Sequence, residues 1–242
     1  MSRKDAARGF TLMDGASRKI RLLAIGSFTL AALAGGCKST VGTTATSMLR
    51  KVQESPDPNI RYQAYAKLGS PRSYDNDEQK AEAAKILAAR LATAKEPVAS
   101  RAEICHTLGE LRRPEGRAIL LRTVSDQEPV VRSAACRALG KAGQPEDWTV
   151  LGRIMATDSD RDCQIAAIES IAELKSPDPR LPVTLVDGME HSDPAVRLAS
   201  LEALRIVSGK DLGSDPGPWK KYAEEHAKTA AVPVEATGPA RR

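Results

Sequence analysis

The chain has 242 residues and a formal net charge of +5, and only 3% of its residues are aromatic. Ala and Leu are abundant instead, which favours closely packed helices over a β-sandwich or barrel. Most of the positive charge lies in residues 1–37, where six basic side chains accompany two acidic ones. The rest of the chain therefore lacks the basic stripe that binding to nucleic acid needs.

The first 36 residues have the pattern of a secretory signal peptide. A basic stretch at residues 18–21 precedes an apolar run at residues 22–33, and small residues follow up to Cys37. This order of charged, apolar and small residues is typical of such signals. The apolar stretch of about 15 residues is shorter than the roughly 20 that span a bilayer. Met13 is a possible alternative start, which would give a leader of more usual length.

The cysteine after these small residues resembles a bacterial lipobox, although Ala34 stands where that motif usually has Leu. The resemblance implies that Cys37 becomes a lipid-bearing N-terminus, which would anchor the protein to the cell membrane or outer membrane, facing the periplasm or the exterior. The alternative is an ordinary cleaved signal followed by an incidental cysteine. Residues 37–54 begin with Ser, Thr and Gly and are then weakly helical, and they are predicted to form a flexible tether.

The chain then repeats one pattern five times, most clearly in residues 126–140 (DQEPVVRSAACRALG). The apolar residue near the end of each copy marks the repeat length. The intervals between these residues are 40, 31, 32 and 33 positions, and the residues are Leu68, Leu108, Leu139, Ile171 and Leu204. A period in this range predicts a solenoid of stacked helical units.

Each copy is interpreted as the first of two antiparallel helices. An acidic residue caps the free N–H groups at the helix start, and a proline there loses no hydrogen bond. In residues 126–140 the apolar side chains fall at helical spacing. Gly140 is predicted to end that helix in the left-handed conformation, and a return helix then follows. Stacked neighbours must supply the core, since no such helix buries its apolar stripe alone.

The pattern D-P-x-V-R-x-x-A-x-x-A-L-G resembles the HEAT-like repeat of the short bacterial, phycobilisome-lyase type. The resemblance covers residues 55–226 and implies a right-handed all-α solenoid of about five repeats. It also implies a structural ladder in which an acidic residue and an arginine pair between neighbouring units. The arginine positions are Arg61, Arg101, Arg132 and Arg197, with Gln164 departing from the pattern; the acidic positions are Asp57, Glu128, Asp160 and Asp193.

The last copy has an altered return segment. Trp219 and Tyr222 are predicted to cover the end of the stack, because a terminal repeat must close the core. Asp211 and Asp215 in the preceding loop lack the other ligands of a calcium loop. Residues 227–242 are rich in Ala and Pro and are predicted to be a disordered tail.

No catalytic, cofactor or metal site is predicted. Cys105, Cys136 and Cys163 are interpreted as small core residues, and no CxxC pair suggests zinc. The repeated His-Glu pairs of HEAT-type di-iron hydroxylases are missing, because the order is reversed at Glu190-His191.

Two functions from different classes remain. The first is a non-catalytic, lipid-anchored scaffold whose concave helix face binds another protein of the cell envelope, as repeat proteins commonly do. The alternative is a repeat-lyase-type enzyme, or an enzyme subunit, that holds a small ligand in the groove. A passive structural component of the envelope is a third alternative.

Overall fold

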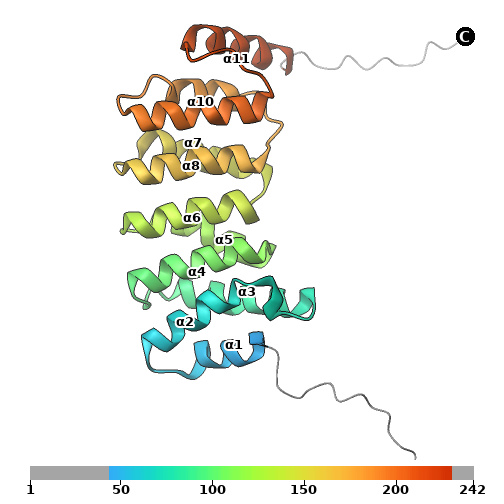
Figure 1. Cartoon of the computed structure of the whole chain (residues 1–242), viewed down its shortest axis with the longest axis vertical. Helices are drawn as coiled ribbons and strands as arrows, with labels where there is room; N and C mark the ends of the chain where they lie inside the picture. The colour runs from blue at the N-terminus through green and yellow to red at the C-terminus, as the bar shows by residue number, and fades with distance from the viewer. Residues whose placement is uncertain (1–43, 231–242) are drawn as a thin grey trace, which may run out of the picture. The chain divides into compact units, whose positions relative to one another are not determined.

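The computed structural model describes residues 44–230, shown in colour in Figure 1. Within this range the chain forms eleven α-helices and three short 3-10 turns, with no strand. The predicted all-α stack of repeated helical units is therefore confirmed. The handedness of the solenoid stays a prediction. The predicted signal peptide at residues 1–36, the predicted lipidation site Cys37 and the rest of residues 1–43 lie outside the described residues, as do residues 231–242.

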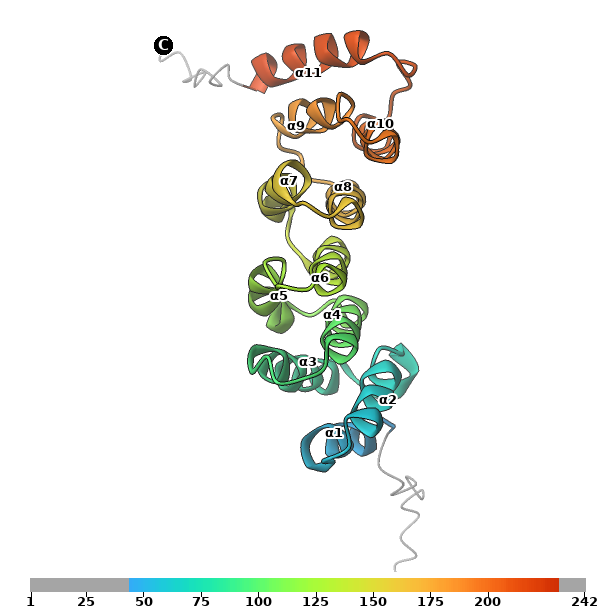
Figure 2. The same cartoon turned by 90° about the vertical axis from the view of Figure 1, so that its left-hand side faces the viewer.

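The helices form two parallel layers, which Figure 2 shows side by side. One layer contains the helices of the repeated pattern, and we call it the DP layer after the Asp-Pro that opens its clearest members. Its members are α2 (Pro58–Leu68), α4 (Val98–Leu111), α6 (Pro129–Ala142), α8 (Arg161–Leu174) and α10 (Pro194–Ser208). The other is the companion layer. Its members are α1 (Thr44–Glu54), α3 (Asp77–Ala92), α5 (Arg117–Thr123), α7 (Trp148–Thr157) and α9 (Leu181–Gly188).

Each helix of the DP layer packs against the companion helix that precedes it in the chain, giving five hairpins between residues 44 and 208. The predicted order was therefore wrong, since each copy of the pattern forms the second helix of its hairpin. The connections within a hairpin and those between hairpins differ in structure. Residues 93–97, 124–128 and 158–160 join the two helices of a hairpin directly, whereas the connections after DP-layer helices mostly contain a 3-10 turn.

This pairing corrects the tether predicted at residues 37–54. Residues 44–54 form α1, the first helix of the first hairpin, and Ala45, Met48 and Val52 on it are buried against the stack. The sequence indicates this helix only weakly, because its apolar residues, spaced three and four apart, make a narrow stripe. The part of the predicted tether at residues 37–43 lies outside the described residues.

The DP-layer helices approach one another at small residues. A Cβ atom on Gly109 of α4 would lie 2.9 Å from Cα of Ala138 in α6, and one on Gly140 of α6 would lie 3.0 Å from Cα of Ser170 in α8. Gly140 lies inside α6, and its φ is not positive. Its predicted role as a left-handed helix end was wrong. It lacks a side chain because a neighbouring helix occupies that space.

The C-terminal end of the described stack is covered by α11 (Pro216–Ala230), which packs against α9. Figure 2 shows this helix in red beyond α9 and α10. Trp219 is fully buried, its ring meets Tyr222 edge-on with centroids 6.2 Å apart, and its indole N–H donates to the carbonyl of Gly213 at 2.9 Å. Residues 227–230, predicted to begin the tail, continue α11, since Ala and Lys are good helix formers.

Candidate protein-binding surface

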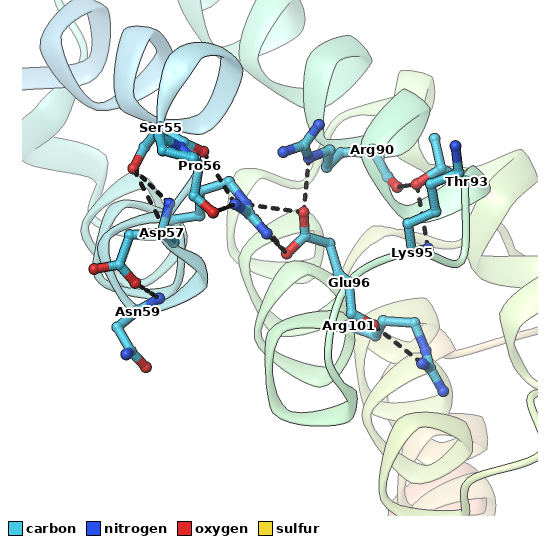
Figure 3. Close-up of polar contacts among 10 residues, drawn as sticks. Ser55, Pro56, Asp57, Asn59, Arg90, Thr93, Lys95, Glu96 and Arg101 are labelled. Atoms are coloured by element: carbon cyan, nitrogen blue, oxygen red, sulfur yellow. Dashed lines mark hydrogen bonds and ion pairs between the residues drawn. The ribbon is translucent and has the colours of Figure 1, made fainter.

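The arginines of the repeated pattern first bind the loop that precedes their own helix. Nη1 of Arg61 donates to the carbonyl oxygens of Ser55 and Pro56 at 3.0 and 2.9 Å, contacts that Figure 3 shows. The equivalent side chains in the other hairpins make similar bonds to loop carbonyls. These side chains are Arg101, Arg132, Gln164 and Arg197. Gln164 replaces Arg because its amide still supplies this bond.

Three of the arginines also bind a carboxylate of the next hairpin. Arg61 lies 3.0 Å from Glu96. The corresponding distances are 2.9 Å for Arg101 and Asp126 and 2.7 Å for Arg132 and Asp158. Glu96 is only 4% exposed and also meets Arg90 at 2.8 Å (Figure 3). These pairs join successive hairpins at the loops between their helices.

The acidic members of this ladder differ from those predicted. Asp57, Asp160 and Asp193 instead accept hydrogen bonds from backbone N–H groups in the first turn of their own helices, at 2.8, 3.0 and 2.8 Å. An N-cap carboxylate is held against its own helix, so the residue that reaches the preceding hairpin lies earlier in the loop. Asp193 approaches an arginine only at 4.0 Å, and that arginine is Arg161 rather than one of the ladder.

Electrostatics support a structural role for the ladder and for the cysteines. The guanidinium of Arg132 lowers the pKa of Asp158 below its ordinary value through hydrogen bonding. Burial raises the pKa of Cys105 and Cys136 to about 12. Cys163 also has its pKa raised to about 12 by burial, and its thiol donates to the carbonyl of Pro129. All three thiols are buried and unbonded to another cysteine, so they are protonated core residues at neutral pH.

Other polar groups also serve the structure. Asp211 pairs with Arg205 at 3.0 Å and accepts from the N–H of Gly213, while Asp215 accepts from the N–H of Gly217. Within residues 44–230, no group of three or more His, Cys, Asp or Glu side chains is placed to hold a metal ion. No helix in that range is long and apolar enough to cross a membrane.

The outward side of the DP layer carries charged side chains at matching positions of successive helices. We call this surface the charged face, and its residues are His106, Glu110, Arg137, Lys141, Glu169, Glu173 and Glu202. Opposite charges meet between neighbouring helices in its first part, where Lys141 lies 2.5 Å from Glu110 and Arg137 lies 4.0 Å from Glu169. At the junction of α8 and α10, Glu169 and Glu202 occupy matching positions, and Ile206 takes the position that matches Glu173.

A groove of about 410 Å³ opens at this acidic junction between α8 and α10. Ala172, Ala199 and Ala203 line it, so its floor is apolar. Ile206 also lines it and is 63% exposed. Glutamates and Lys175 complete the lining. Sequence reasoning missed this groove, and the signal that could have revealed it is the change from Gly109 and Gly140 to Ala172 at the equivalent helix position.

The match to a known family falls within these hairpins. Residues 84–172 match the family of HEAT repeats. The matched segment begins within α3 and ends within α8, so it falls within the second, third and fourth hairpins. It supports a HEAT-like repeat protein, and HEAT repeats generally serve as protein-interaction scaffolds, which suggests a non-catalytic role. No curated protein matches the chain.

Proposed function

We propose that this protein is a lipid-anchored scaffold of the cell envelope that binds another protein through the charged face of its DP layer. The observation that carries the binding role is the groove between α8 and α10. It combines an alanine floor and the exposed Ile206 with a rim of glutamates. An apolar centre within a polar rim is the usual anatomy of a protein interface.

The groove also suits a protein partner better than a reacting small molecule. Its polar lining consists of three glutamates and Lys175, and a nucleophile with an adjacent base is not among them. Exposed charges at the rim of a groove instead orient an approaching protein partner and raise its association rate. A basic partner segment with an aliphatic side chain fits this combination.

Site-specific photo-crosslinking tests this assignment. A photoreactive amino acid at Ala199, inside the groove, is expected to join the protein to one envelope protein in cells that make it. The matched control is the same amino acid at Val183, which is 40% exposed on α9 of the companion layer. Equal crosslinking from both positions, or none from Ala199, would refute the charged face as the binding surface.

The proposed anchor rests on the leader, with its basic and apolar segments before Cys37. Cys37→Ala is expected to release the protein from membranes, because a single thiol carries the lipid that holds it there. Fractionation of cells measures the release, and mass spectrometry of the native N-terminus should find a diacylated peptide that begins at Cys37. Continued membrane association of the variant would contradict the anchor.

A further inference from the structure

Arg197 differs from the other arginines of the ladder. Its Nη1 binds the preceding loop as they do, donating to the carbonyl oxygens of His191 and Ser192 at 2.8 Å each. Arg61, Arg101 and Arg132 each add a carboxylate from the following hairpin. For Arg197, no carboxylate within residues 44–230 takes this place. One side of its guanidinium is therefore available to an acidic group from elsewhere.

The helix that carries Arg197 also has an uncovered edge. No later helix of the described chain joins the DP layer after α10, because α11 packs against α9 of the companion layer. Leu198 is consequently 55% exposed. The residues at the same position in α4, α6 and α8 are all less exposed beneath the next hairpin. These residues are Ala102, Ser133 and Ile165.

A groove of about 340 Å³ lies along this edge. Met189, Leu198 and Leu201 give it apolar walls, and Ser214 and Pro216 close it on the side of α11. Arg197 supplies the one charged side chain of the lining. The groove thus offers an apolar surface beside a guanidinium, and guanidinium groups bind carboxylates in a bidentate geometry.

We infer that this groove binds a segment of a partner protein in which an Asp or Glu precedes the start of a helix bearing an aliphatic side chain. Such a segment would repeat at Arg197 the contact that Asp126 and Asp158 make at Arg101 and Arg132. Its aliphatic side chain would cover Leu198. The inference rests on the proposed scaffold function and adds a second contact surface to it. This groove takes an acidic partner segment, whereas the groove between α8 and α10 takes a basic one.

The chain itself is a poorer source for this segment. Glu235 is the only acidic residue in residues 231–242. The groove lies at the start of α11, whose 15 residues span about 22 Å, while five extended residues after Ala230 cover only about 17 Å. A second copy of the chain is also a poor source. If its first hairpin stacked against α10, Ser55 and Pro56 would lie where the ladder needs an acidic side chain.

Fluorescence anisotropy with a labelled peptide tests the inference on the full chain. The peptide copies residues 124–142 with Cys136→Ser, and it contains the acid, Asp126, that binds Arg101 in the intact stack. We expect saturable binding that Arg197→Glu weakens by about tenfold or more, since a charge-assisted pair is lost. A peptide with Asp126→Arg should recover binding to the Arg197→Glu protein.

Two surface variants separate this groove from its neighbour. Leu198→Ser should weaken peptide binding. Ile206→Ser should leave it unchanged, because Ile206, another apolar residue of α10 that is more than half exposed, lies in the other groove. Absence of saturable binding at millimolar peptide, or equal binding to the Arg197→Glu protein, would overturn the inference. Tighter binding after deletion of residues 231–242 would show that the tail is the occupant and would overturn it too. Crosslinking from Ala199 is independent of these outcomes, so the scaffold proposal can survive them.

Discussion

Trp219→Ala is expected to lower the free energy of unfolding by about 3–5 kcal/mol, the usual cost of removing a buried tryptophan. The indole is fully buried, and its N–H is bonded to Gly213. Because α11 contacts the stack chiefly through α9, the loss should appear first as detachment of α11. Hydrogen exchange would show lost protection in α11, and thermal denaturation would show a lower midpoint.

Trp219→Phe is the matched control for this prediction. It keeps an aromatic ring in the same space and removes the hydrogen bond to Gly213, so the expected cost falls to about 1–3 kcal/mol. An unchanged midpoint for Trp219→Ala would mean that α11 does not close the core. Loss of protection throughout the stack, without an earlier loss in α11, would contradict the local character of the effect.

Asp158→Ala should cost about 3 kcal/mol, at the lower end of the range for breaking a buried ion pair. The Asp158 side chain is 5% exposed and that of Arg132 is 14% exposed, so the substitution leaves the guanidinium partly buried without its partner. Urea denaturation monitored by circular dichroism measures the change.

Asp160→Ala provides the comparison, two residues away in the same loop. Asp160 caps α8 through the N–H of Cys163, and loss of such a cap costs about 1 kcal/mol. The sequence-based prediction had placed Asp160 in the ladder, whereas the structure places Asp158 there. If Asp160→Ala proved the more destabilising of the two, the ladder drawn from the structure would be wrong.

The helices of the DP layer could be predicted from the sequence because their apolar spacing and acidic caps are local signals. Their pairing could not be predicted in the same way. Each such helix has a neighbour on either side in the chain, and an apolar stripe does not say which one it covers. The connections after α4 and α6, residues 112–116 and 143–147, are as long as residues 93–97 and 124–128, so loop length does not supply that information.

The sequence pattern also did not identify which acidic residues pair with the arginines of the ladder. Asp126 and Glu128, like Asp158 and Asp160, stand two residues apart in one loop, and either carboxylate could reach a neighbouring arginine. In both loops the earlier carboxylate binds the arginine, although only Asp160 of the two later ones caps its own helix, and Glu128 makes no such bond. The position of the carboxylate in the loop therefore decides the partner, and residue type alone does not reveal it.

The close approach of α4, α6 and α8 has a mechanical consequence. Gly109 and Gly140 let backbones touch, and contacts between backbones deform little under load. At the next junction Ala172 takes the equivalent position and the groove opens between α8 and α10. Elastic compliance is therefore distributed unevenly along these hairpins. We expect the junctions of α4 with α6 and of α6 with α8 to resist bending more than the junction of α8 with α10.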